Sequence, residues 1–246
     1  MPLVEALRSA AAFVYVEELD APVVSLPDAH HLSRSLRLRP GDAVTACNGR
    51  GSFRACRVAR IALGLSGRRR GAPTEVTLEP DGPVRVTGQP EVQIGVGFAL
   101  VKQDRSDWAV AKLTELGVDR ITPMICERSV VRPEGPRRAE RLARIAREAA
   151  MQSRRLFLPV VEAPRRVGDI VAELALGGGT ALAEPGGGRL SLVTPFVLVG
   201  PEGGWSPAEL AFRLPLVGLG DTILRTETAA LAAAARLVAL RSNDSG

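Results

Sequence analysis

Two stretches in the last third of the chain constrain its fold more than any other feature: Leu198–Leu210 and Gly218–Leu237. Each reads as an apolar strand, a tight loop that contains glycine, and then a helix. Units of this kind build parallel sheets, and α/β proteins bind small molecules at the carboxyl ends of such strands. The two stretches therefore predict an α/β domain whose ligand site is formed by these loops.

The alternation of strand and helix begins near residue 92 and continues to the end of the chain. It predicts a mainly parallel sheet with helices on both faces. One helix should begin at Asp104 or Ser106 and stop at Gly117, because glycine readily adopts the left-handed backbone that ends helices. A longer helix is expected at 137–155. The apolar face of this longer helix consists of Leu142, Ile145, Ala146 and Ala149.

Residues 13–87 are instead rich in short runs of Val, Thr and Phe, which predict β-strands. Asn48-Gly49 between two such runs indicates a hairpin. One helix should interrupt the strands from Asp28 to Leu38, with Asp28 as its N-cap. Short strands with one helix favour a small barrel. Glycines and prolines near residue 88 divide the chain into domains 1–88 and 89–246.

Cysteine and histidine usage argues against disulfides and metal sites. The cysteines, Cys47, Cys56 and Cys126, are odd in number and include no CxxC pair, which favours a reducing cytosol. His30 and His31 are adjacent, a spacing that does not suit metal ligands, so we expect no metal. No apolar run is long enough to span a membrane, and the N-terminal residues read as an extension rather than a signal peptide.

The formal net charge is +5, and all but two of the 32 basic residues are arginine. Genomic composition bias would explain this, but so would a surface that binds polyanions, since guanidinium groups match phosphate oxygens. Clustering favours the second interpretation. The clusters are Arg34 with Arg37 and Arg39, 68–70, and 137–155.

The first loop, Gly200–Gly204, contains more glycine than a plain turn between strand and helix needs. Glycine permits a ligand to approach the backbone closely, and Glu202 adds a carboxylate. The loop matches neither the Walker phosphate motif nor the GxGxxG dinucleotide motif. Ser206, Pro207 and Glu209 then supply the N-cap, the first-turn proline and the capping-box acid of a helix.

The second loop ends in Arg225 and Glu227, with Thr226 or Thr228 able to cap the alanine-rich helix that follows. Glu227 would complement the helix dipole in any case. A cation at a helix N-terminus is electrostatically misplaced, so Arg225 is expected to serve a ligand.

In these two loops and several other segments, the chain resembles a known family. It is similar to the SPOUT-class RNA methyltransferases in GPEGG with the following SPAEL helix and in ILRTETA, and within that class to the 16S ribosomal RNA (uracil-N3)-methyltransferase family. Further shared motifs are HHLSRSLRLRPGD at 30–42, KQDRSDWAVAKLTELGVDRITPMICERSVVR at 102–132 and IAREAAMQSRR at 145–155, so the resemblance covers nearly the whole chain. It departs at Asp221-Thr222, where the family often has an arginine.

The resemblance implies an N-terminal PUA-like β-barrel that binds RNA and a C-terminal trefoil-knotted α/β domain. It also implies a homodimer and S-adenosylmethionine (SAM) as the methyl donor. Three loops would hold SAM: Ala183-Glu184 after the TALAEP strand, Val199–Gly204, and Leu219–Ala229. The cofactor-binding residues that it implies are Ala183, Glu184, Val199, Gly200, Gly203, Leu219, Leu224, Thr226, Thr228 and Ala229.

The implied reaction transfers a methyl group to N3 of a uracil in 16S rRNA, with the assembled small ribosomal subunit as the expected substrate. Arg225 would stabilise the anion that forms when N3 loses its proton. Glu227 or Glu202 would accept that proton or orient the base, and the sequence does not separate them. The arginines expected to bind RNA phosphates are Arg34, Arg37, Arg39, Arg128, Arg147 and Arg154.

Three alternatives stay open at this stage. A non-catalytic RNA-binding module would account for the arginines but not for the glycine loops. An enzyme acting on a nucleotide phosphate would use those loops, yet the chain has no Walker lysine. A SPOUT enzyme that modifies another RNA position would share every feature above.

Overall fold

The computed structural model describes residues 7, 9–25, 28–29, 37–63, 73–129, 131, 136–174 and 179–244 of the 246-residue chain. The chain divides into two compact units. The first comprises Met1–Gln89 together with Met151–Leu158, and the second comprises Pro90–Ala150 and Pro159–Gly246. A single boundary near residue 88 does not anticipate the return of 151–158 to the first unit.

The first unit is built on a five-stranded sheet of order β1-β2-β3-β4, with β5 also paired to β3. The strands are β1 (Ala12–Tyr15), β2 (Ala43–Cys47), β3 (Ser52–Leu63), β4 (Pro73–Pro80) and β5 (Arg85–Val86). β1 and β2 run parallel, whereas β3 pairs antiparallel with β2, β4 and β5. The strand-rich N-terminal region that the sequence predicts is therefore confirmed.

The hairpin at Asn48-Gly49 is confirmed as the link between β2 and β3. The Oδ1 atom of Asn48 accepts hydrogen bonds from the N–H groups of Arg50 (2.8 Å) and Ser52 (3.1 Å). Gly49 and Gly51 have φ angles of 71° and 91°, a backbone conformation that glycine adopts without strain. The side chain of Asn48 thus fixes a turn that the two glycines make possible.

The predicted helix from Asp28 to Leu38 is wrong at both ends. Ser25 precedes the helix, since its Oγ bonds to the Asp28 carboxylate (2.7 Å) and receives the Asp28 N–H (3.4 Å). Asp28 and Ala29 are already helical, so Asp28 is not the N-cap. Residues 37–39 are not helical, and Arg37 has a φ of 54°. Residues 30–36 lie outside the described part of the chain.

Residues 151–158 complete the first unit by bonding to the ends of its strands. Tyr15 donates its hydroxyl proton to the carbonyl oxygen of Arg155 (2.7 Å). The Gly51 N–H donates to the carbonyl oxygen of Leu156 (2.9 Å), and the Leu158 N–H donates to that of Gly49 (3.0 Å). This segment therefore satisfies main-chain groups at the hairpin.

The second unit contains a seven-stranded sheet of order β12-β10-β11-β6-β7-β8, with β9 also paired to β7. The strands are β6 (Gly95–Ala99), β7 (Arg120–Ile125), β8 (Val160–Val161), β9 (Arg165–Arg166), β10 (Thr180–Gly188), β11 (Phe196–Val199) and β12 (Leu216–Val217). Every pairing described in this sheet is parallel, as the sequence predicts.

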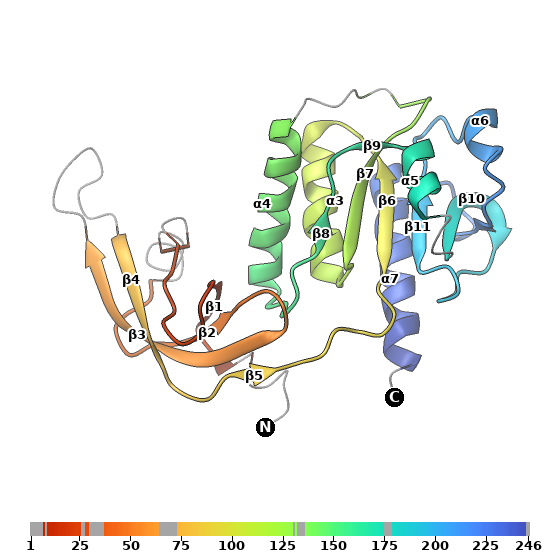
Figure 1. The fold of residues 1–246 in the computed structure, drawn as a ribbon. Coiled ribbons are helices and arrows are strands. Elements are labelled where there is room, and N and C mark those ends of the chain that lie inside the picture. Colours follow the sequence, from red (N-terminus) through yellow and green to blue (C-terminus); the bar gives the residue numbers. More distant parts are fainter. Residues whose placement is uncertain are drawn as a thin grey trace. The chain divides into compact units, whose positions relative to one another are not determined.

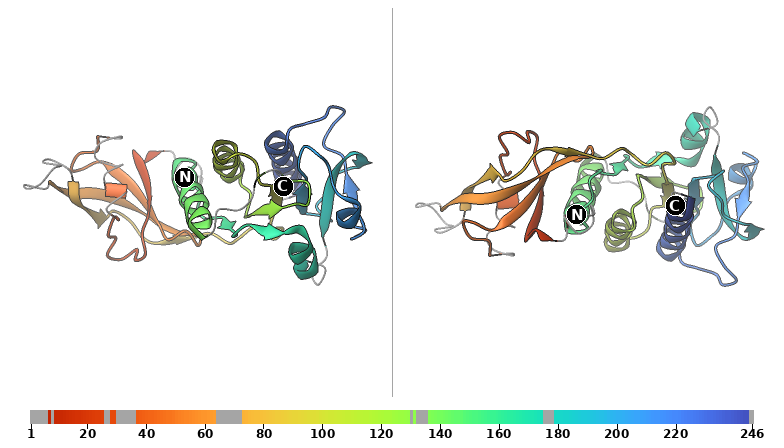
Figure 2. Two further views of the ribbon diagram at one scale, coloured as in Figure 1. Left: turned by 90° about the horizontal axis from the view of Figure 1, so that it is seen from above. Right: turned by 90° about the horizontal axis from the view of Figure 1, so that it is seen from below.

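Helices cover both faces of this sheet, which confirms the predicted layers. The helices are α3 (Gln103–Leu116), α4 (Pro136–Gln152), α5 (Val167–Leu174), α6 (Pro207–Leu210) and α7 (Thr226–Asp244). In the views from above and below, α3 and α7 lie on one face and α5 on the other (Figures 1 and 2). One core cluster joins the strands to α3, α4 and α7, and a second joins them to α5 and Trp205.

Some of the predicted helix ends are correct and others are wrong. Gly117 ends α3 with a φ of 99°, as predicted. The predicted start of α3 is wrong, because the helix begins at Gln103 and Ser106 is buried within it. The hydroxyl of Ser106 donates to the carbonyl oxygen of Val101 (3.0 Å) and accepts the Val101 N–H (3.3 Å). Helix α4 ends at Gln152, three residues earlier than expected.

All three cysteines are free, as the sequence suggests, and the structure shows that they are buried. Burial raises the pKa of Cys47 to about 11 and that of Cys126 to about 12, so these thiols are neutral at ordinary pH. No helix among the described residues is long and apolar enough to cross a membrane.

Helix α7 offers a direct test of the core. Leu237 is fully buried against the sheet, whereas Leu240, one turn later, is 36% exposed. Leu237→Ala should lower the free energy of unfolding by about 2–5 kcal/mol, because the cavity that it leaves cannot fully collapse. Leu240→Ala, the matched control, should lower it by less than about 1 kcal/mol. Urea denaturation followed by circular dichroism measures both, and equal losses would contradict this packing.

Candidate functional site

Strand β10 and the loops that follow β11 and β12 meet around one cavity of about 460 Å³. Ala183, Glu184 and Pro185 contribute from within β10; the loop expected at Ala183 and Glu184 is wrong, because the strand continues to Gly188. The loop after β11 contributes the glycine-rich segment from Val199 to Trp205. The residues from the loop after β12 and the start of α7 are Leu219, Gly220, Thr222, Ile223, Leu224, Arg225, Thr226 and Ala229.

Two side-chain hydrogen bonds hold these loops together. The hydroxyl of Thr226 donates to the carbonyl oxygen of Gly200 (3.0 Å), which joins the start of α7 to the loop after β11. The indole Nε1–H of Trp205 donates to the carbonyl oxygen of Ala183 (3.0 Å), which joins the loop after β11 to strand β10. A Cβ at Gly200 would lie 3.0 Å from the Trp205 ring, so this glycine lets the indole pack onto the backbone.

Helix α6 is fixed by the capping box that the sequence predicts. Ser206 accepts the Glu209 N–H (3.1 Å), and the Glu209 carboxylate accepts the Ser206 N–H (2.9 Å). The same buried carboxylate also accepts the N–H of Glu127 (3.0 Å). Glu209 therefore has a structural role, and its acceptor capacity is used within the protein.

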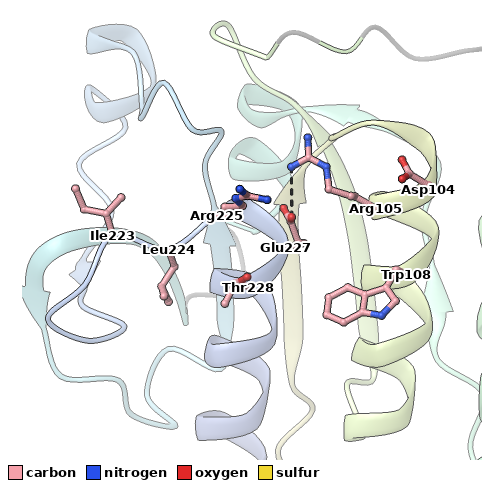
Figure 3. Close-up of a pocket in the computed structure, with 8 residues that line it drawn as sticks. All are labelled: Asp104, Arg105, Trp108, Ile223, Leu224, Arg225, Glu227 and Thr228. Carbon is pink, nitrogen blue, oxygen red and sulfur yellow. Dashed lines mark hydrogen bonds and ion pairs between the residues drawn. The ribbon is translucent and has the colours of Figure 1, made fainter.

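A second cavity, of about 670 Å³, lies beside the first, between α3 and the start of α7 (Figure 3). We call it the α3–α7 cavity. Its lining residues are Asp104, Arg105, Trp108, Ile223, Leu224, Arg225, Glu227 and Thr228. Ile223, Leu224 and Arg225 line both cavities, so the two spaces share one wall.

Arg105 links the two candidate carboxylates. Its Nη1 lies 3.3 Å from Oε1 of Glu227 and 3.5 Å from Oε1 of Glu202. In Figure 3 the guanidinium reaches from α3 toward the carboxylate of Glu227 at the start of α7. The hydrogen bond with Glu227 raises the pKa of Arg105 above its ordinary value, so Arg105 remains a cation.

The two carboxylates differ in their surroundings. The side chain of Glu227 is 9% exposed, and that of Glu202 is 51% exposed. Within the part of the chain that the structure describes, the buried Oε2 atom of Glu227 has no hydrogen-bond partner. Buried polar atoms are normally paired, so this atom needs an explanation, which an ordered water or a catalytic role would supply. Glu202 has no buried, unpaired oxygen of this kind in the described part of the chain.

Arg225 is exposed and lines both cavities. Its guanidinium has no hydrogen bond or ion pair among the residues that the structure describes. A cation without an internal partner at the start of α7 is free to meet a ligand, which agrees with the electrostatic reason for singling it out.

The residues expected to bind a cofactor all line the first cavity except Thr228, which lines the α3–α7 cavity. Sequence reasoning missed Arg105, Trp108 and Trp205. Trp108 is 48% exposed on α3, an unusual position for a large aromatic side chain, while Trp205 is buried. The signal that could have found them was their place in the segments singled out above: Arg105 and Trp108 lie in the motif at 102–132, and Trp205 lies in Leu198–Leu210.

The arginines expected to bind RNA have varied surroundings. Arg37 and Arg39 are exposed, and Arg34 lies outside the described residues. Arg128 is exposed and donates to the carbonyl oxygen of Gly203 (3.0 Å). Arg147 is half-buried on α4. Among the described side chains no group of three or more His, Cys, Asp or Glu residues could hold a metal ion.

Arg154 has a structural role that the sequence does not suggest. Its guanidinium donates to the carbonyl oxygens of Leu7 and Ala10, so its N–H groups are directed at the protein's own backbone. It has a φ of 56°, beyond the end of α4.

Comparison with known families gives two matches. The model of the RNA methyltransferase domain matches residues 88–238, and the model of the RNA methyltransferase PUA domain matches residues 27–63. A Synechocystis protein named ribosomal RNA small subunit methyltransferase E is 33% identical over 243 residues, which cover 91% of this chain and 75% of the relative.

Solved structures give the same result. The ribosomal RNA small subunit methyltransferase E of Neisseria gonorrhoeae bound to S-adenosyl methionine has a TM-score of 0.75 and 28% identity, covering 93% of this chain and 97% of that one. A probable rRNA-methyltransferase from Porphyromonas gingivalis has a TM-score of 0.74 and 28% identity, covering 95% and 99%. The predicted fold class, an α/β SPOUT-type domain after a PUA-like domain, is confirmed; the path of its trefoil knot stays a prediction.

The bond between Trp205 and Ala183 can be tested by a conservative change. Trp205→Phe should lower the free energy of unfolding by about 1–3 kcal/mol, because it leaves the Ala183 carbonyl oxygen without its donor. Trp108→Phe, on the exposed surface of α3, should change it by less than about 0.5 kcal/mol. Differential scanning calorimetry compares the two, and equal effects would show that the Trp205 bond does not hold the loops.

Proposed function

Because the chain belongs to the RNA methyltransferase family, we propose that it is a SAM-dependent enzyme that methylates N3 of a uridine in 16S rRNA. One observation supports this most directly. The glycine-lined cavity shares a wall with the α3–α7 cavity, where the unpaired cation of Arg225 and the buried carboxylate of Glu227 lie. A methyl donor and an acceptor base need two adjoining sites of this kind.

The first cavity suits SAM in shape and chemistry. Its glycines have no side chain, so a ligand can approach the main chain closely, and Gly204 and Gly220 have open space where a Cβ would stand. Val199, Leu219 and Leu224 offer an apolar surface for an adenine ring. When bound, SAM supplies a methyl group on a positively charged sulfonium, and the carboxylates at the cavity edge favour that charge.

The residues beside this cavity would prepare the acceptor atom. N3 of uracil is an imide nitrogen, so its proton must leave before or while the nitrogen attacks. The N3 electron pair then forms the bond to the methyl carbon while the electron pair of the carbon–sulfur bond stays on sulfur. Arg225, held close to both cavities, would stabilise the negative charge on the uracil carbonyl oxygens.

Between the two candidate proton acceptors, we assign the role to Glu227. Its buried Oε2 atom has acceptor capacity that no described residue uses, while Arg105 fixes its orientation through Oε1. Glu202 is half-exposed to water and has only the longer contact with Arg105. A proton acceptor must hold a fixed position against the base, which the surroundings of Glu227 provide.

The first unit would bind the RNA around the target. Exposed arginines such as Arg37 and Arg39 offer phosphate contacts without reading sequence. The names of the relatives support small-subunit rRNA as the substrate, and we expect the assembled subunit to be the form that is modified. From the family resemblance we further propose a homodimer.

The target position is tested by comparing RNA from a deletion strain with RNA from its parent. Nuclease digestion and mass spectrometry should show the loss of one 3-methyluridine from 16S rRNA, restored when the purified protein and SAM are added to mutant subunits. Loss of a different modified nucleotide would contradict N3 methylation, and an unchanged profile would favour a non-catalytic RNA-binding protein.

Arg225→Ala should separate binding from chemistry. We expect the affinity for SAM, measured by calorimetry, to change less than about threefold, while kcat falls about 100- to 1,000-fold because the charge on the base is no longer stabilised. Arg213→Ala, which replaces an exposed arginine outside both cavities, is the control and should keep wild-type kcat. Full methylation by Arg225→Ala would remove Arg225 from the mechanism.

A matched pair of variants decides the proton acceptor. Glu227→Gln should lower kcat by about 100- to 10,000-fold at saturating SAM, because an amide does not accept the proton. Glu202→Gln should lower it by less than about fivefold. The reverse order of effects would transfer the role to Glu202.

A further inference from the structure

Helix α4 begins with positive charge at the end where helices favour negative charge. Its first residues are Pro136, Arg137 and Arg138, and its first turn contains no acidic residue. The free N–H groups of a first turn already carry partial positive charge, so two further cations are electrostatically misplaced there. Arg137 is exposed to solvent, which weakens the repulsion, whereas Arg138 is only 6% exposed. Arg138 therefore needs a compensating negative group.

The structure shows no such group for Arg138 among the described residues. Its Nη2 donates to the carbonyl oxygen of Val101 over 3.4 Å, longer than an ordinary bond, and its buried Nε has no hydrogen-bond partner. Arg141, one turn later on α4, differs in this respect, because it donates its Nε–H to Asp107 of α3 (2.9 Å). Buried charges are normally paired, and a buried polar group that is unpaired calls for a water or an ion.

The guanidinium of Arg138 lies at the start of a second helix, α3, which runs beside α4 (Figures 1 and 2). Val101, whose carbonyl oxygen it reaches, comes directly before Lys102, the N-cap residue of α3. Lys102 makes no side-chain capping hydrogen bond, so no cap satisfies the first N–H groups of this helix. Asp104, the acid in the first turn of α3, lines the α3–α7 cavity instead. Two helix N-termini and an unpaired guanidinium thus meet at one place.

This combination favours an anion with several oxygens. Main-chain N–H groups and a guanidinium only donate hydrogen bonds, and helix N-termini favour negative charge. A guanidinium donates through Nε and a neighbouring Nη as a fork, which matches two oxygens of a phosphate. Strands β6 and β7 precede α3 and α4 and run parallel with β11, so the site lies at the same edge of the sheet as the glycine-lined cavity. An RNA strand that reaches this cavity brings phosphates to that edge.

We propose that the N-termini of α3 and α4, with Arg138 between them, bind a phosphodiester of the RNA backbone. The proposal rests on the proposed function and adds a contact that positions the RNA without reading its sequence. Lys102 and Arg137, exposed at the same two helix starts, add positive charge around the site. Because Nε is shielded from water in the free protein, binding requires the guanidinium to turn about its flexible stem. Arg105, in the same first turn of α3, lines the α3–α7 cavity, so a phosphate held here fixes the strand close to the reacting base.

Inorganic phosphate is the first probe, because it requires neither RNA nor methyl transfer. In differential scanning calorimetry, about 50 mM phosphate should raise the Tm of the wild type by about 2–4 °C over chloride at the same ionic strength. Arg138→Met keeps the apolar stem, removes the charge and should lose this shift. Arg213→Met, which removes an exposed arginine outside both cavities, is the control and should keep it. A wild type with the same Tm in both salts, or an equal shift in Arg138→Met, would exclude the site.

The same scans in chloride show whether the protein itself compensates Arg138. Removing an uncompensated buried charge should leave the Tm of Arg138→Met equal to or above that of the wild type. An internal carboxylate partner would instead be left buried alone, and the Tm would fall by about 6–20 °C. Glu134, the acid that comes before Arg138 in the sequence, lies outside the described residues. Comparable losses of Tm in Glu134→Gln and Arg138→Met would make it the partner and overturn the proposal.

Binding to small ribosomal subunits from the deletion strain tests RNA as the source of the phosphate. Arg138→Met should weaken binding about 10- to 100-fold, the effect of losing hydrogen bonds to a charged group, and lower the slope of log K against log salt by about one. Arg138→Lys keeps the charge without the fork, so it should restore the slope and only part of the affinity. The Kd for SAM should stay the same. A weaker Kd for SAM with unchanged subunit binding would assign Arg138 to the cofactor carboxylate and contradict an RNA site.

These measurements stand apart from the test of the proposed function. Phosphate-dependent Tm and the salt slope of subunit binding require no methyl transfer, so both can support the site in a protein that makes no 3-methyluridine. Conversely, wild-type subunit binding and wild-type methylation by Arg138→Met would disprove the site and leave the enzymatic function intact.

Discussion

The site depends on the register of four parallel strands. Ala183 of β10 pairs with Val199 of β11 on one side and with Val217 of β12 on the other, and Val199 pairs with Phe98 of β6. Main-chain hydrogen bonds therefore place Ala183 of β10 level with the last residues of β11 and β12. Side-chain hydrogen bonds from Thr226 and Trp205 then hold the two loops after β11 and β12 to each other and to β10. A shift of register in β10 would separate Ala183 from both loops.

Charged side chains of opposite sign are paired beside these strands. Arg105 joins the carboxylate of Glu202, in the loop after β11, to that of Glu227, in the first turn of α7, which offsets their repulsion beside the cavity. The arrangement leaves one cation, Arg225, and one carboxylate oxygen of Glu227 unpaired among the described residues. These two groups have opposite character and lie along the same cavity wall. A weakly acidic ring with carbonyl oxygens on either side of its N–H complements both.

Local sequence signals predicted much of this structure, and long-range contacts account for the rest. The parallel sheet, the stop at Gly117 and the capping box of Ser206 and Glu209 each depend on residues that are close in sequence. The pair of Arg105 and Glu227 joins residues 122 positions apart, and no local pattern announces it. The residues of the first, glycine-lined cavity were predicted from the family resemblance rather than from periodicity. Among them Thr228 faces the neighbouring cavity, because one step along a helix turns a side chain by about 100°.

The return of residues 151–158 to the first unit has a consequence for biosynthesis. The strands of that unit leave the ribosome early, yet the groups that complete its hairpin, including the carbonyl oxygen of Leu156 and the N–H of Leu158, are made about a hundred residues after Gly49 and Gly51. Until then Tyr15, Gly49 and Gly51 lack these partners and must bond to water. The N-terminal unit therefore matures only after β6, α3, β7 and α4 have been synthesised. The first unit can therefore complete its fold only after the first part of the second unit has been synthesised.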